Sequence, residues 1–117
     1  MQTIKFVTQN VIELRHTQTR TSIELSKKLV VIHIGKVNGE IPLDVDLSDF
    51  PDSDMVSRLQ AKIQREGNIY FIEDMRSAKG TYLNQKRLSI GQRYRLRGGD
   101  KISFGEGDLV SFLFGLL

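Results

Sequence analysis

The sequence contains no cysteine and no tryptophan, and only two prolines among its 117 residues. The lack of cysteine excludes disulfide bonds and thiolate metal ligands, and it agrees with a reducing compartment such as the cytoplasm. No apolar run approaches the roughly 18 residues that a membrane span requires. The opening residues, MQTIKF, lack the basic and apolar regions of a secretory signal. We therefore expect a cytoplasmic protein without membrane insertion.

The two signs of charge are nearly balanced but unevenly placed. Seventeen Lys and Arg against fourteen Asp and Glu leave a net charge of +3, which by itself is too weak to predict nucleic-acid binding. Residues 40–54 hold six acids and no base, and their two prolines predict a loop there. These acids are not spaced as in a calcium-binding loop. We therefore predict neither a metal nor a cofactor.

Hydrophobic runs and turn residues predict short β-strands. Leu29–Ile34 is rich in β-branched residues and ends at Gly35, and similar runs occur at Ile69–Ile72 and Val110–Phe114. Arginines alternate with apolar residues over positions 93–97, as in a strand with one face in water. Glycine and asparagine turn signals recur between these runs. The pattern predicts one all-β domain, residues 1–117, built as a compact sandwich or barrel.

The segment Ser53–Glu66 allows two interpretations. An amphipathic helix would place Val56, Leu59 and Ile63 on one face. A turn followed by a strand would instead point Leu59, Ala61 and Ile63 inward. The strand-rich surroundings favour the strand.

Three clusters combine a glycine or a hydroxyl group with a cation at predicted strand ends or turns. They are Ile34-Gly35-Lys36, Val56-Ser57-Arg58-Leu59-Gln60, and the eight residues from Ser77 to Asn84. In the third cluster, Gly80 separates Lys79 from a strand-like segment. We expect this glycine to supply a positive φ or a close backbone approach.

In order and spacing, these clusters resemble the motifs of the forkhead-associated (FHA) domain, which are Gly-Arg, Ser-Arg-x-His and Ser-x-x-Gly-Thr-x-x-Asn. The resemblance extends from about Val30 to Phe114 and is closest to bacterial members of the family. It includes Gly99-Asp100 followed by Ile102 and Gly105. It implies a two-sheet β-sandwich with its binding loops at one end (SMAD/FHA-like). The implied function is a signalling module that binds a phosphothreonine-containing segment of a partner protein.

The resemblance also assigns roles to individual positions. A phosphate ester carries about −1.5 to −2 charge and three acceptor oxygens, so it favours converging cations and hydroxyl groups. The residues implied to contact the phosphopeptide are Lys36, Ser57, Arg58, Ser77 and Lys79. Those implied to shape the loops are Gly35, Gln60, Gly80, Thr81 and Asn84. Asn84 suits either a left-handed hairpin position or a tie between loops.

Four positions depart from the family pattern. Lys36 replaces an arginine, Gln60 a buried histidine, Ala78 a hydroxyl-bearing residue and Lys79 an asparagine. The changes at Ala78 and Lys79 support an alternative function, in which a degenerate FHA domain mediates protein–protein interaction without phosphate.

Two further classes of function are less favoured. The basic ladder at positions 93, 95 and 97 lacks the exposed aromatic residues that stack on single-stranded nucleic acids. No nucleophile, base and orienting group can be assembled from the motifs. We therefore expect neither a nucleic-acid partner nor an enzyme.

Overall fold

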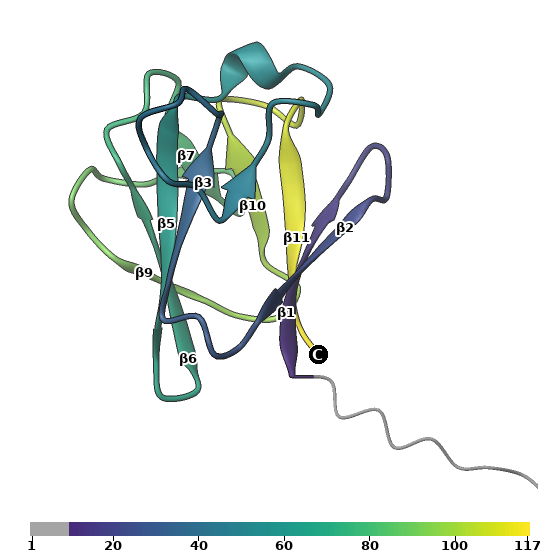
Figure 1. Ribbon diagram of the computed structural model, residues 1–117, viewed down its shortest axis with the longest axis vertical. Coiled ribbons are helices and arrows are strands. Elements are labelled where there is room, and N and C mark those ends of the chain that lie inside the picture. Colours follow the sequence, from purple (N-terminus) through teal and green to yellow (C-terminus); the bar gives the residue numbers. More distant parts are fainter. Residues whose placement is uncertain (1–9) are drawn as a thin grey trace, which may run out of the picture.

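The computed structural model describes residues 10–117, which form two β-sheets packed face to face and one short 3-10 helix (Figure 1). The predicted all-β, two-sheet β-sandwich is confirmed. Residues 1–9 of the predicted 1–117 domain lie outside the described residues. Within residues 10–117, no helix has the length and hydrophobicity needed to cross a membrane.

The first sheet has six strands in the order β2-β1-β11-β10-β7-β8. Their bounds are β1 Val11–His16, β2 Ser22–Ser26, β7 Thr81–Leu83, β8 Lys86–Arg87, β10 Lys101–Phe104 and β11 Ser111–Leu116. All neighbouring strands are antiparallel. The first and last strands of the chain lie side by side, with Ile12 opposite Leu116.

The second sheet has five strands in the order β4-β3-β5-β6-β9. Their bounds are β3 Val31–Gly35, β4 Val45–Asp46, β5 Leu59–Glu66, β6 Ile69–Asp74 and β9 Tyr94–Leu96. The prediction of a loop over residues 40–54 therefore needs a correction. This stretch also contains β4, because Val45 is buried in the core and the backbone there pairs with β3.

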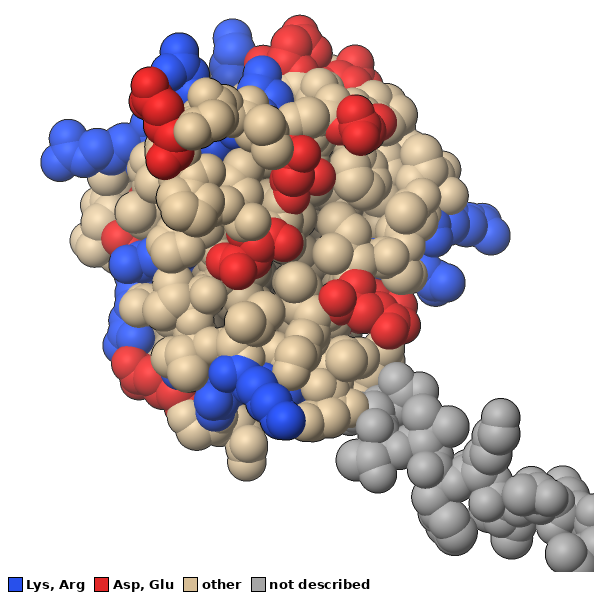
Figure 2. Space-filling model, in the orientation of Figure 1, with Lys and Arg blue, Asp and Glu red and all other residues tan. Residues whose placement is uncertain are grey.

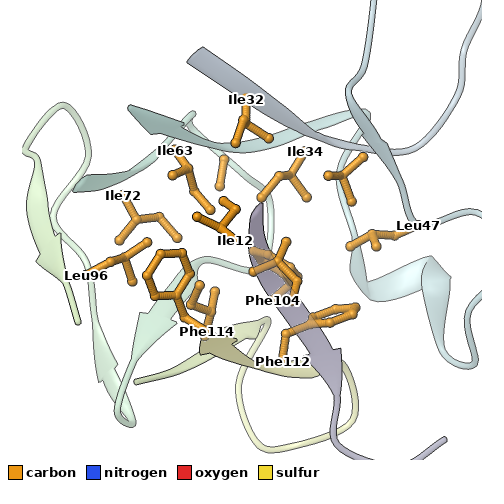
Figure 3. Close-up of a cluster of buried hydrophobic side chains, with 14 of the residues drawn as sticks. Ile12, Ile32, Ile34, Leu47, Ile63, Ile72, Leu96, Phe104, Phe112 and Phe114 are labelled. Carbon is orange, nitrogen blue, oxygen red and sulfur yellow. The ribbon is translucent and has the colours of Figure 1, made fainter. Parts of the chain in front are cut away.

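The core fills the space between the two sheets (Figure 3). Its largest fully buried side chains include Phe104, Phe112 and Phe114 from the first sheet and Ile34 and Ile63 from the second. Burial of each such side chain contributes about 1.5–3 kcal/mol. This apolar layer holds the two sheets together and fixes where their connecting loops emerge.

The segment Ser53–Glu66 forms a turn and a strand. A 3-10 helix, η1 (Ser53–Met55), ends at Val56, and β5 begins at Leu59. The strand alternative is confirmed and the amphipathic helix is wrong. The register between β3 and β5 shifts between Ile34 and Gly35, so Gln60 lies at an irregularity in the pairing and is completely buried beside Ala61.

The hairpin of β1 and β2 has no counterpart among the strands expected from the sequence. Along β1, the buried side chains of Ile12, Leu14 and His16 alternate with the more exposed Glu13 and Arg15. A polar residue on the inward face weakens the alternation of apolar and polar residues. This explains why the hydrophobic pattern did not identify the strand.

His16 is completely buried between aromatic rings. Its ring centroid lies 4.9 Å from that of Phe50 and 5.1 Å from that of Phe112. The backbone N–H of Thr19 donates to its Nδ1 at 3.1 Å. Burial lowers the pKa of His16 below its ordinary value of 6.5, because the charged imidazolium loses its hydration.

Replacing His16 with phenylalanine should reduce the pH dependence of stability. Because the pKa of His16 is lower in the folded state, its stabilising contribution is complete above about pH 6.5 and is lost as the pH falls through the folded-state pKa. The free energy of unfolding, measured by urea denaturation between about pH 7.5 and 5, should therefore fall for the wild type and fall less for His16→Phe.

The matched control is His33→Gln, because the side chain of His33 is 39% exposed. This variant should still lose stability as the pH falls, because it keeps His16. Equal slopes for the wild type and His16→Phe would show that His16 is not the source of the pH dependence.

Candidate functional site

Three loops meet at the end of the sandwich that carries η1, at the top of Figure 1. They border an open pocket of about 440 Å³. Four of the five residues predicted to contact a phosphopeptide line it: Lys36, Ser57, Arg58 and Lys79. Lys36 follows β3, Ser57 and Arg58 precede β5, and Lys79 lies between β6 and β7. Segments far apart in the chain therefore bring a hydroxyl group and three cations to one place.

Gly35 allows the first two loops to touch. The backbone N–H of Lys36 donates to the carbonyl of Arg58 at 3.1 Å. A Cβ atom on Gly35 would lie 1.9 Å from that same carbonyl oxygen. Only glycine fits this contact, which places Lys36 beside Arg58.

Ser57 links the second loop to the third. Its hydroxyl oxygen accepts the backbone N–H of Ala78 at 2.9 Å, and its own N–H donates to Oε1 of Gln60 at 2.9 Å. Since the hydroxyl acts as an acceptor toward Ala78, its proton stays available for a ligand in the pocket.

The buried side-chain amide of Gln60 connects these loops. Besides accepting from Ser57, its amide donates through Nε2 to the carbonyl of Gly80 and to Oγ1 of Thr81, both at 3.0 Å. An amide carries both a donor and an acceptor, as a neutral imidazole does, so Gln60 can brace the loops where the resemblance expects a histidine.

Asp74 is a central residue that the sequence motifs did not identify. It is 2% exposed, and its carboxylate accepts hydrogen bonds from the Thr81 hydroxyl at 2.7 Å, the Ser77 hydroxyl at 2.6 Å and the Ser77 N–H at 3.2 Å. The available signal was the spacing Asp-x-x-Ser at a strand end, which is typical of side chain to backbone turns.

Ser77 therefore lies apart from the cations. It is 8% exposed, its hydroxyl proton is directed at Asp74, and it is not among the residues that line the pocket. The backbone N–H of the next residue, Ala78, is the group that reaches Ser57. The geometry gives Ser77 a place in the support of the third loop.

Gly80 has the positive φ expected of it, and its nearest neighbour is the Arg87 side chain. Its φ is +85°, and a Cβ atom there would lie 2.8 Å from Nε of Arg87. Its carbonyl accepts the N–H of Gly105 at 2.8 Å as well as the amide of Gln60. The turn at Gly80 thus joins the third loop to β10 and to the brace formed by Gln60.

Asn84 combines the two roles considered for it, but in another part of the molecule. It has a φ of 49° in the turn between β7 and β8. Its side chain donates to Asp100 at 3.0 Å and accepts the N–H of Lys101 at 2.9 Å. It therefore ties the turn after β7 to the turn before β10. Neither turn lines the pocket.

The pocket is dominated by positive charge. Among the residues that the structure describes, its lining holds Lys36, Arg58 and Lys79 and a single acid, Asp54. The ion pairs found within residues 10–117 involve none of these three cations. Figure 2 shows basic side chains gathered at this upper end of the molecule, next to acidic ones. The arrangement suits an anionic ligand that arrives from solvent.

Gly35→Ala should disrupt the site through the backbone. The added methyl group overlaps the Arg58 carbonyl, so β3 or β5 must shift, at a cost of about 1–3 kcal/mol. Urea denaturation measures this loss. Gly98→Ala is the matched control, because no atom lies within 4 Å of its added Cβ, and it should leave stability nearly unchanged. Similar stabilities for the two variants would refute the contact.

Gln60→Leu should destabilise the protein by about 1–3 kcal/mol, because it leaves buried hydrogen-bonding groups without partners. Gln64→Leu, the same change at a half-buried position of the same strand, is the control. Gln60→His should recover much of the loss. The prediction fails if thermal unfolding gives Gln60→Leu and Gln64→Leu the same melting temperature.

Comparison with curated proteins and protein families identifies relatives of this chain. The family model described as the FHA domain matches residues 32–105. Protein FraH from Nostoc sp. (strain PCC 7120) is 53% identical over 103 residues, which are 88% of this chain and 36% of FraH. The chain thus spans about a third of the length of that relative.

Solved structures show the same fold. Mycobacterium tuberculosis EmbR, in complex with a low-affinity phosphopeptide, matches with a TM-score of 0.72 at 27% identity, over 90% of this chain and 24% of that chain. The N-terminal FHA domain of S. cerevisiae Rad53p, in complex with a phosphothreonine peptide, matches with a TM-score of 0.74 at 21% identity, over 92% of this chain and 94% of that chain. The sequence motifs, the β-sandwich fold and the family match agree. This chain therefore belongs to the FHA domain family.

Proposed function

We propose that this domain binds a phosphothreonine-containing segment of a partner protein, as a signalling module. The observation that carries the proposal is the convergence of Lys36, Arg58, Lys79 and the Ser57 hydroxyl on one pocket from three separate loops. A phosphate dianion matches this set, because it presents three acceptor oxygens to several cations and a hydroxyl donor.

Each residue has a distinct role in the proposed complex. Arg58 supplies a planar guanidinium that can hold two phosphate oxygens at once, whereas Lys36 and Lys79 act as point charges. Ser57 donates its remaining proton. We assign Ser77 to the support of the loop, together with Asp74, because its hydroxyl is already bonded there.

The ligand class is supported by the related structures. EmbR was solved with a phosphopeptide and the Rad53p domain with a phosphothreonine peptide, and both share the fold of this chain. The loops that line the pocket here occupy one end of that fold. An extended peptide that crosses this end would place its phosphate among the three cations.

One observation favours a second candidate function, binding of a partner protein without phosphate. Ala78 brings no hydroxyl group to the pocket, and its backbone N–H is already bonded to Ser57. The pocket therefore offers fewer neutral donors than the family motif implies. In this alternative the same rim contacts an acidic or neutral segment of the partner.

Arg58→Ala should weaken binding of a phosphothreonine peptide by about ten- to a hundredfold, because the phosphate loses a charge-assisted hydrogen bond from the guanidinium. The test uses a panel of peptides of varied sequence, each with threonine, phosphothreonine or phosphoserine, and measures affinity by calorimetry. Arg95→Ala, which removes the same charge from the exposed part of β9, should bind like the wild type.

The three peptide forms separate the two candidate functions. A preference for phosphothreonine that is lost in Arg58→Ala supports the phosphate-dependent function. Equal binding of all three forms supports the alternative. Equal loss in Arg58→Ala and Arg95→Ala would mean that only overall charge matters, and the assignment of Arg58 to the phosphate would be wrong.

A further inference from the structure

A second pocket lies at the opposite end of the sandwich. It has a volume of about 380 Å³, and its lining includes Lys27, Lys28, Arg65, Asn68 and Tyr70. Leu59 lines the first pocket at the start of β5 and Arg65 lines the second near the end of that strand, so the two lie roughly 20 Å apart. In Figure 1 this is the lower end, which carries the turn between β5 and β6.

Two polar side chains point into the sandwich at this end. Side chains alternate along a strand, so Arg65 shares the inward face of Ile63, and Tyr70 shares that of Ile72. Arg65 and Tyr70 are paired directly opposite each other on β5 and β6. A guanidinium and a phenol therefore stand together where the apolar core ends.

These two side chains have polar atoms that the protein leaves without partners. Within residues 10–117, three buried side-chain nitrogen or oxygen atoms have no hydrogen-bond partner, and two of them are Arg65 Nε and Tyr70 Oη. Tyr70 is 3% exposed. Buried polar groups are normally bonded, because leaving one unbonded costs free energy, so two such atoms at one pocket point to a ligand.

The geometry holds both groups ready as donors. Arg65 is anchored by a hydrogen bond from its guanidinium to the carbonyl of Gly67 at 2.9 Å. Burial raises the pKa of Tyr70, although the nearby Arg65 opposes the shift, so the phenol keeps its proton at neutral pH. Both residues line the pocket, and their unpartnered donor atoms lie buried beside it.

The charged side chains known to line the pocket are all basic. Lys27 and Lys28, in the connection between β2 and β3, join Arg65 in the lining, and among residues 10–117 no acid lines it. Figure 2 shows basic side chains at the lower edge of the molecule, with acidic ones to their left. Three cations without an opposing carboxylate attract an anion and disfavour a cation.

We propose that this pocket is a second ligand site, which binds a small phosphate-bearing anion through Arg65, Tyr70, Lys27 and Lys28. A phosphate group has enough acceptor oxygens to pair with the guanidinium and the phenol at once while the two lysines neutralise its charge. The site is separate from the first pocket, and the inference does not depend on the proposed function.

The test is a titration of the 15N-labelled 117-residue chain with inorganic phosphate and with glycerol 3-phosphate, at constant ionic strength maintained with chloride. The expected result is a saturable NMR shift of the Arg65 Nε–H and of the amides near Asn68 and Lys28. Tighter binding of glycerol 3-phosphate identifies a phosphate ester as the ligand, and equal binding identifies the free ion.

Tyr70→Phe is the most specific test variant, because it removes one unpartnered hydroxyl group and keeps the aromatic ring. It should weaken phosphate binding by about tenfold or more, the effect of losing a hydrogen bond to a charged group. In phosphate-free buffer it should melt at a higher temperature than the wild type. It should also lose the increase in melting temperature that phosphate gives the wild type.

Controls separate this pocket from the rest of the surface. Arg65→Gln and Lys28→Ala should weaken the response, whereas Arg95→Gln on the exposed part of β9 should not. Arg58→Ala should keep the shift at Arg65, because phosphate bound in the first pocket is not its cause. Shifts that do not saturate, or that persist unchanged in Tyr70→Phe and Lys28→Ala, would overturn the proposal.

Discussion

The rim of the first pocket depends on the hydrogen bonds that converge on the buried carboxylate of Asp74. A buried carboxylate is costly unless several donors surround it, and here Ser77 and Thr81 supply them. Thr81 in turn accepts from Gln60, whose amide oxygen accepts the N–H of Ser57. One continuous network therefore runs from the interior to the surface loop, and it holds Ser57 in position before any ligand arrives, which lowers the entropic cost of binding.

The site combines hydrogen-bonded loops with the long, flexible side chains of two lysines. Ser57 and the backbone around Gly35 are held by short contacts, whereas Lys36 and Lys79 have flexible side chains with compact charges. In the complex that we propose, attraction of the anion and recognition of its shape would thus fall to different residues. In the proposed complex, selectivity rests mainly on Arg58 and Ser57, and the lysines add charge without a fixed geometry.

The sequence was sufficient to predict the two-sheet sandwich and the grouping of four of the five predicted contact residues. β-branched runs ended by glycine and the order of three short motifs are local signals, and motifs at loop positions converge once the sandwich topology is known. Hydrogen-bond partners are not local. For Asp74, only the bond to Ser77 has a local signal, the Asp-x-x-Ser spacing, whereas its bond to Thr81 spans seven positions. Asn84 bonds to a turn sixteen residues away, so its role does not follow from a pattern within one segment.

The lack of a local sequence signal also explains why β1 and the unpartnered Tyr70 hydroxyl were not predicted. The inward face of β1 ends in His16, which breaks its apolar pattern, and a shift in strand register buries Gln60 although it is polar. The unpartnered phenol of Tyr70 is visible only in three dimensions, because its spacing along β6 is that of an ordinary core residue.

The pairing of β1 with β11 also affects how the domain would be carried within a longer polypeptide. Leu117 donates its N–H to the carbonyl of Val11 at 3.0 Å, so the described chain enters and leaves the sandwich at neighbouring points. Both points lie at the pole that holds the basic pocket, whose lining includes Asn10 and Leu116. Tethers joined there would leave the opposite pole free to meet a partner.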